Sequence, residues 1–159
     1  IFDALACVHA AEAPDLPVFD ALVRIRPRLD EFQEPWIEDW IDEYLPPPDS
    51  TGLVHGDFHV GQLIEDDEGV IWILDFDDLA RGPREADLGN FAAHLATRPE
   101  TRSDNLLTGF RHWSERILRL SSGADPSLAE RYGRIALLRR ALKLAEQGNR
   151  RLLSEIRNA

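Results

Sequence analysis

The sequence predicts a mainly helical α+β domain in which a small β-hairpin carries polar loops. Apolar residues recur at helical spacing through most of the chain, whereas residues 53–75 contain short β-branched runs separated by turn residues. A length of 159 residues with 43% hydrophobic content suffices for one packed core. We therefore expect a single domain over residues 1–159, helical over 1–50 and 83–159, with the hairpin and its loops over 51–82.

The first fifty residues contain three candidate helices. Apolar side chains from Ile1 to Val8 fit the end of one helix. Residues 19–32 and 36–45 have helical spacing as well, and in the second segment tryptophan and isoleucine side chains share one face. The proline triplet at 46–48 removes backbone donors and ends this helical region.

Helical spacing returns after the hairpin. We expect helices over about 85–97, 103–121 and 127–146, with a short helix after Asn149. No apolar run approaches the ~20 residues that span a bilayer, so the sequence predicts no membrane partner.

Charge and cysteine content limit the partners and the compartment. The net charge is −11, and an acidic chain repels phosphate backbones, so we expect no nucleic-acid partner. Residues 101–159 are the basic part, with 12 basic against 6 acidic side chains. The single cysteine, Cys7, cannot form an internal disulfide, and we expect it in the core of a cytoplasmic protein. Lys143 is the only lysine, and this preference for arginine is typical of GC-rich bacterial genomes.

The stretch VHGDFHVGQLI, residues 54–64, places charged and amide side chains between two predicted strands. Asp57 and Gln62 lie on this loop, and Asp75 directly follows the apolar run VIWIL. Carboxylate and amide oxygens are hard ligands that suit Mg²⁺, which keeps most of its coordination for water and phosphate. Such an ion neutralises phosphate charge while a second carboxylate orients a hydroxyl group. The two loops therefore predict phosphoryl-transfer chemistry.

The order of HGD, Gln62, Asp75 after an apolar strand, and Asp87 in ADLGNFA resembles the catalytic segment of the aminoglycoside phosphotransferase family, which has a protein-kinase-like fold. Gln62 stands where most members have asparagine, which is similar to maltokinase-like relatives of that family. The resemblance implies the C-terminal lobe of a kinase. It also implies transfer of the γ-phosphoryl group of ATP, or GTP, to a hydroxyl of a sugar, aminoglycoside or similar metabolite.

The same resemblance implies a role for each residue of the pattern. Asp57 would be the catalytic base that orients the acceptor hydroxyl. Gln62 and Asp75 would be the Mg²⁺ ligands. His55 would be structural and hold the catalytic loop near Asp75, and Asp87 would accept hydrogen bonds from the loop backbone.

Kinases of this shape hold the nucleotide with a glycine-rich strand pair and a lysine. Neither precedes residue 54, and Lys143 follows the motif. We therefore expect that the N-terminal nucleotide lobe is absent from these 159 residues, that it is required in cis, and that the chain alone is inactive.

Two alternatives remain open. His55, Asp57 and His59 alternate along the loop and, with Asp75 nearby, could bind Zn²⁺ or Mn²⁺ as in metal-dependent phosphoesterases. The second alternative is a non-catalytic remnant that binds a ligand or a partner. The kinase-like interpretation is favoured because four spaced matches agree, and His59 is assigned to packing or capping of the loop.

Overall fold

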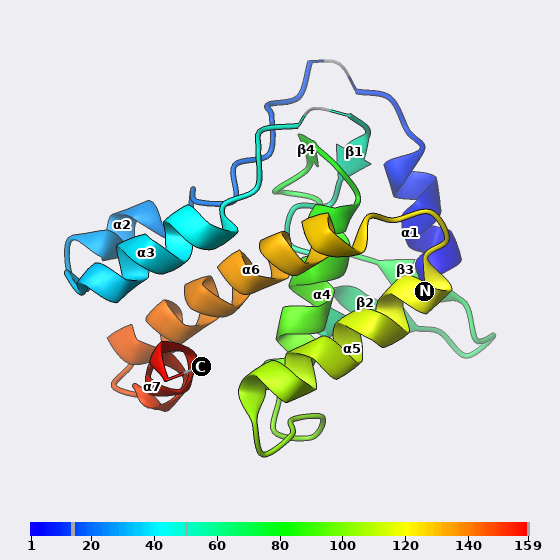
Figure 1. Cartoon of the computed structure of the whole chain (residues 1–159). Helices are drawn as coiled ribbons and strands as arrows, with labels where there is room; N and C mark the ends of the chain where they lie inside the picture. Colours follow the sequence, from blue (N-terminus) through cyan, green and yellow to red (C-terminus); the bar gives the residue numbers. More distant parts are fainter. Residues whose placement is uncertain (14, 50, 159) are drawn as a thin grey trace.

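The structure is a computed structural model that describes residues 1–13, 15–49 and 51–158. Its centre is formed by three long helices, α4 (Glu85–Thr97), α5 (Leu106–Leu120) and α6 (Pro126–Glu146). Helix α4 packs against α5 and α6, and the short helix α7 (Arg151–Arg157) folds back onto α5 and α6 (Figure 1). None of the helices in the described ranges is long and apolar enough to cross a membrane. The predicted mainly helical α+β fold is confirmed.

Two of the three central helices, α5 and α6, begin where the sequence supplies capping side chains. Asn105 Oδ1 accepts a hydrogen bond from the backbone N–H of Thr108 at 2.9 Å and so caps α5. Asp125 Oδ1 accepts one from Ser127 N at 2.8 Å and caps α6. Pro126 follows this cap at the first helical position, where its missing donor costs nothing. These local signals explain why the boundaries predicted for α5 and α6 differ from the observed ones by only a few residues.

Two glycines bring α4 and α6 into close contact. A Cβ atom at Gly89 on α4 would lie 2.5 Å from the carbonyl oxygen of Ala129 and 2.6 Å from the backbone nitrogen of Gly133, both on α6. Both distances are far below the ~3.5 Å of ordinary nonbonded contact between carbon atoms. The spacing of α4 and α6 therefore depends on the absence of a side chain at Gly89, whereas a side chain at Gly133 would first meet the ring of Phe110 on α5.

Three short helices lie at the periphery: α1 (Phe2–His9), α2 (Arg26–Leu29) and α3 (Pro35–Tyr44). Helix α3 packs on α6 through its buried face, which includes Ile37 and Ile41, whereas α1 lies against the strands (Figure 1). Cys7 on α1 is exposed, so the prediction that it belongs to the core is wrong.

The strands form two small antiparallel sheets. Strand β1 (Leu53–Val54) pairs with β4 (Ala80–Arg81), and β2 (Leu63–Glu65) pairs with β3 (Ile71–Ile73). The predicted hairpin is therefore only the β2–β3 part. The chain before the catalytic loop pairs instead with the strand that follows Asp75, because the loop after β3 turns back to it. As a result, both predicted polar loops start or end at paired strands.

The helix predicted over residues 19–32 is reduced to the single turn of α2. Phe19 N donates to the carbonyl oxygen of Arg81 at 2.7 Å, so this part of the chain is held in extended form beside β4. Pro27 lies at the start of α2, where proline fits, and would have interrupted a longer helix. The pairing with β4 and the proline therefore prevent the long helix that the apolar spacing predicted.

One face of the β2–β3 hairpin exposes large apolar side chains. Ile64 is 51% exposed, Trp72 56% and Phe76, just beyond β3, 42%. Trp72, although a large aromatic side chain in an apolar run, is therefore not part of the core. Leu63 and Ile73, which alternate with these residues along the strands, pack against the core.

Candidate active site

Asp87 anchors the loop that carries Asp57. Its side chain is 1% exposed in the first turn of α4. Oδ2 accepts a hydrogen bond from His55 N at 2.8 Å, and Oδ1 accepts one from Gly56 N at 3.0 Å. His9 Nε2 on α1 lies 2.9 Å from Oδ2. A buried carboxylate with three polar neighbours fixes the course of this loop, which is the contact that the predicted support role requires.

His55 connects the same loop to the end of β3. The ring is fully buried, and Nε2 lies 2.8 Å from the carbonyl oxygen of Leu74, the residue before Asp75. Gly56 beside it has φ +83°, and a Cβ atom there would lie 2.2 Å from the carbonyl oxygen of Asp78. Only glycine fits this turn. Gly56 is therefore required by the backbone conformation, and His55 by its contact with the end of β3.

Two arginines hold the Asp57 carboxylate. Arg24 Nη1 donates to Oδ2 and Arg139 Nη2 donates to Oδ1, each at 2.9 Å. Arg139 also donates to Asn90 Oδ1 at 2.8 Å, and Asn90 in turn donates to the carbonyl oxygen of Phe58 at 2.9 Å. Burial alone would raise the pKa of the Asp57 carboxyl, but the two guanidinium groups outweigh it and hold that pKa well below its ordinary value. Asp57 is therefore an ionised hydrogen-bond acceptor across the physiological pH range.

Gln62 and Asp75 face each other at the hairpin. Gln62 Nε2 donates to Asp75 Oδ2 at 2.8 Å, and Asp75 is exposed. Asp75 has φ +63° and is the only non-glycine residue in the described ranges with a positive φ. This left-handed conformation costs of order 1 kcal/mol and is more common at functional sites than elsewhere.

These two side chains fit a magnesium ion by the chemistry of their donors. Each offers an oxygen, the two residues are already adjacent, and the exposed side of Asp75 leaves room for water and phosphate oxygens. The amide of Gln62 would have to present its oxygen instead of its nitrogen, which a rotation of the terminal amide achieves.

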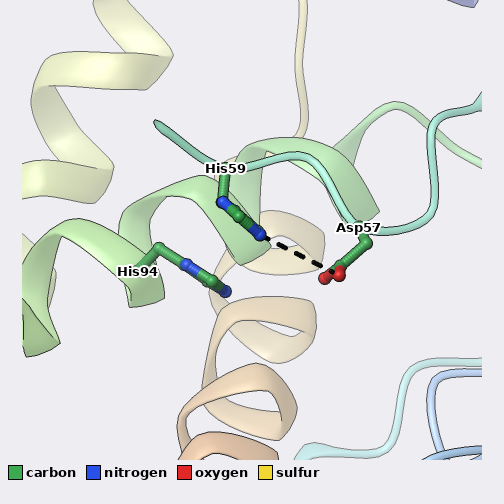
Figure 2. Close-up of side chains that lie close together, drawn as sticks. All are labelled: Asp57, His59 and His94. Atoms are coloured by element: carbon green, nitrogen blue, oxygen red, sulfur yellow. Dashed lines mark ion pairs between the residues drawn. The ribbon is translucent and has the colours of Figure 1, made fainter. Parts of the chain in front are cut away.

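Two histidines lie beside Asp57 (Figure 2). One nitrogen of His59, one of His94 and a carboxylate oxygen of Asp57 lie within 4.8 Å of one another. The two imidazole rings stack at 4.2 Å between centroids, with 8° between their planes. His59 also caps the turn η1 (Val60–Gln62), because its Nδ1 accepts a hydrogen bond from Gly61 N at 2.9 Å.

Arg140 lies against the second of these histidines. Its Nη1 is 2.9 Å from Nε2 and 3.0 Å from Nδ1 of His94, and its Nε donates to Thr97 Oγ1 at 2.6 Å. Burial, assisted by Arg140, lowers the pKa of His94 to about 2, and burial lowers the pKa of His59 as well. Both rings are therefore neutral at pH 7, whereas Arg140 keeps its charge although burial, assisted by Arg139, lowers its pKa to about 10.

The model of the phosphotransferase enzyme family matches residues 3–142. The chain belongs to this phosphotransferase family. The family resemblance seen in the sequence is thereby confirmed, and the fold is the kinase-like lobe that it implies. Neither the curated proteins nor the solved structures gave a match to the chain. The similarity to maltokinase-like members stays a prediction.

The arrangement in this phosphotransferase argues against the metallo-phosphoesterase alternative. His55 cannot serve as a ligand, because its ring is buried and Nε2 faces the Leu74 carbonyl oxygen. His94 takes its place beside Asp57 and His59, but guanidinium groups contact both Asp57 and His94. A resident divalent cation at this cluster would be repelled by these charges.

Sequence reasoning missed four residues of the phosphotransferase site: Arg24, His94, Arg139 and Arg140. One signal was available for His94. Asp87, Asn90 and His94 follow at i, i+3 and i+7, so they share one face of α4. The arginines carried no such signal, because they come from segments that only tertiary packing brings to Asp57.

Proposed function

We propose that the chain is the acceptor-binding and catalytic lobe of a phosphotransferase that moves the γ-phosphoryl group of ATP, or GTP, to a hydroxyl of a small molecule such as a sugar, an aminoglycoside or a similar metabolite. The observation that carries the proposal is the Asp57 carboxylate. It is fixed by two arginines at a cavity, one short loop away from the Gln62–Asp75 pair. Membership of the phosphotransferase family supports the reaction class.

In the proposed reaction the acceptor hydroxyl donates a hydrogen bond to Asp57. The hydroxyl oxygen forms a bond to the γ-phosphorus, the bond from that phosphorus to the leaving nucleoside diphosphate breaks, and Asp57 receives the hydroxyl proton. Because the transition state of phosphoryl transfer is loose, orientation of the hydroxyl contributes more than strong basicity. A carboxylate with a lowered pKa and a fixed direction suits this role.

Asp75 and Gln62 would hold Mg²⁺, and the ion would neutralise charge on the nucleotide phosphate oxygens. His55 would keep the Asp57 loop close to the metal ligands, since its ring contacts the carbonyl oxygen of Leu74, the residue before Asp75. Asp87 contributes through the loop backbone and does not touch the reacting groups.

A nucleotide-binding N-terminal lobe in cis is part of the proposal. The exposed apolar side chains of the β2–β3 hairpin support it, because a large apolar surface next to Asp75 is suited to contact with another part of a longer chain. The same surface lies beside the metal-binding pair, where the nucleotide phosphates would be held.

The test is turnover of the full-length enzyme with ATP and Mg²⁺, measured as nucleoside diphosphate released for each acceptor offered. We expect Asp57→Asn to reduce kcat by ~10² to 10⁴-fold while acceptor binding is kept, because a positioned proton acceptor contributes about that much. Asp67→Asn, an exposed change in the β2–β3 turn, is the matched control and should leave kcat unchanged.

A small loss of rate in Asp57→Asn would remove Asp57 from this role. Hydrolysis of phosphate esters without ATP would favour the phosphoesterase alternative instead. Ligand binding without any turnover by the full-length protein would favour a non-catalytic binding protein.

A further inference from the structure

The cavity beside Asp57 is unusually rich in cationic side chains. It has a volume of about 500 Å³ and lies between the segment that carries α2, the catalytic loop and helices α4 and α6. Only two carboxylates line it, Asp57 and Glu146. Five cationic side chains line it as well: Arg24, Arg28, Arg139, Arg140 and Lys143.

Ion pairs account for three of these cations. Arg24 and Arg139 share Asp57, and Arg24 also pairs with Asp78 from outside the lining. Arg28 pairs with Glu146, with 2.9 Å between Nε and Oε2. The carboxylates at this cavity are therefore already engaged by the first three cations.

Arg140 and Lys143 have no such partner. Among residues 1–13, 15–49 and 51–158, no carboxylate forms an ion pair with either side chain. Arg140 is partly buried, and its hydrogen-bonding contacts are to the neutral side chains of Thr97 and His94. A partly buried cation without an ion-pair partner has lost part of its hydration, and an anion bound next to it would compensate for that loss.

Arg140 lies at the right place to hold one end of an acceptor. His94, which its guanidinium contacts, lies within 4.8 Å of Asp57 between their polar atoms. Lys143 follows one turn later on α6, so both cations face the same cavity. A compact molecule can therefore present a hydroxyl to Asp57 and an anionic group to the two cations at once.

We propose that the acceptor of this enzyme is an anionic hydroxylated metabolite whose carboxylate or phosphate group is bound by Arg140 and Lys143 while its hydroxyl faces Asp57. The inference rests on the proposed function, because it identifies the bound anion as the phosphoryl acceptor. It also narrows that function, since a polycationic aminoglycoside would meet like charges in this cavity.

The first experiment measures binding by isothermal titration calorimetry, which needs no turnover. The probes are gluconate, glucose 6-phosphate, glucose and kanamycin, offered to the full-length protein. We expect gluconate or glucose 6-phosphate to bind at least roughly tenfold more tightly than glucose, since one hydrogen bond to a charged group contributes about that factor. Comparison of the dissociation constants of gluconate and glucose 6-phosphate shows whether the site prefers a carboxylate or a phosphate group.

Variants locate the anion. Lys143→Glu changes an exposed side chain and should weaken binding of the preferred anion by roughly tenfold. Arg140→Gln should weaken it by roughly 10 to 100-fold. Arg119→Glu, the same reversal of charge at an exposed position of α5, is the matched control and should leave the dissociation constant unchanged. Arg140 contacts Thr97 and His94 on α4, so Arg140→Gln could prevent folding. In that case the effect of Lys143→Glu on the dissociation constant tests the anion site.

Tighter binding of glucose or kanamycin than of either anion would overturn the inference, as would anion binding that neither variant alters. Turnover with ATP separates this failure from failure of the proposed function. Phosphorylation of kanamycin or glucose but of neither anion keeps the phosphotransferase and removes the anionic acceptor. Anion binding that is lost in Lys143→Glu, without any phosphoryl transfer, keeps the anion site and removes the phosphotransferase.

Discussion

The loop that carries Asp57 and the hairpin that carries Asp75 differ in how firmly the structure holds them. In the first, a buried carboxylate and a buried histidine ring hold the loop, and two arginines hold the Asp57 carboxylate. In the second, Asp75 is exposed, adopts a left-handed backbone conformation and has one side-chain partner, Gln62. The apolar side chains around it face solvent.

This difference indicates which half of the site is complete. The part that we propose to orient the acceptor is assembled by contacts within the described residues. The part that would hold the nucleotide and its metal has its polar pair in place but lacks the surrounding contacts that fix a catalytic group. Substitutions of the residues that hold the first part in place should therefore affect folding, whereas substitutions in the second part should affect ligand use.

Asp87→Ala tests the first half and should lower stability strongly. It leaves the buried N–H groups of His55 and Gly56 without an acceptor, and each such loss costs about 1–3 kcal/mol. We expect the free energy of unfolding to fall by roughly 2 to 5 kcal/mol, measured by urea denaturation.

Glu115→Ala, an exposed change on α5, serves as the control and should have little effect. Asp87→Asn keeps one acceptor oxygen and should lie between the two. If Asp87→Ala were as stable as the control, the loop could not depend on Asp87 for its shape.

The pH dependence of stability should identify His94 as part of the rigid half. Burial holds the pKa of folded His94 near 2, so below the ordinary value of 6.5 the unfolded chain binds a proton that the folded chain does not. Stability is therefore complete above pH 6.5 and declines as the pH falls, by at most about 1.4 kcal/mol per pH unit. His59 acts in the same direction, and Asp57 contributes only below its ordinary pKa of 3.8.

Unfolding curves between pH 4 and 7 measure this slope. His94→Asn should flatten it, and His112→Asn, a change at an exposed position of α5, should leave it as in the parent protein. Parallel slopes for all three proteins would show that His94 is protonated equally in the folded and unfolded chains.

Asp75→Asn tests the exposed half in the full-length enzyme. Loss of a charged oxygen ligand should raise the Mg²⁺ concentration for half-maximal activity by roughly tenfold or more. Stability should change by less than about 0.5 kcal/mol, since asparagine tolerates the left-handed backbone as well as aspartate does. An unchanged Mg²⁺ requirement would contradict the ligand assignment.

Ile64→Thr should have the smallest effect. The side chain is half exposed on β2 and threonine keeps the β-branched shape, so we expect a change in unfolding free energy below about 0.5 kcal/mol. Phe58→Ala is the contrast, because this ring is fully buried and its loss should cost about 3–5 kcal/mol. Calorimetric melting of both variants measures the difference, and a large effect of Ile64→Thr would mean that this face is covered.

The sequence predicted the parts of the site that depend on local order. His55, Asp57, Gln62 and Asp75 could be found because each lies a fixed number of residues from an apolar strand. The sequence did not predict the residues that reach the site from distant segments of the chain. Arg24 comes from a stretch that was expected to be helical and is instead held in place by β4, and Arg139 reaches Asp57 only because α6 packs against α4.

The glycine contact between α4 and α6 gives evolution a means of adjusting substrate range from a distance. Asn90 and His94 lie on one of these helices, and Arg139 and Arg140 lie on the other. A methyl group added at position 89 would lie 2.5 Å from the backbone of α6, so these helices would have to separate, and the cavity between them would change shape without a substitution of any residue that lines it. Libraries that seek new acceptors should therefore include position 89, which lies outside the lining of the cavity.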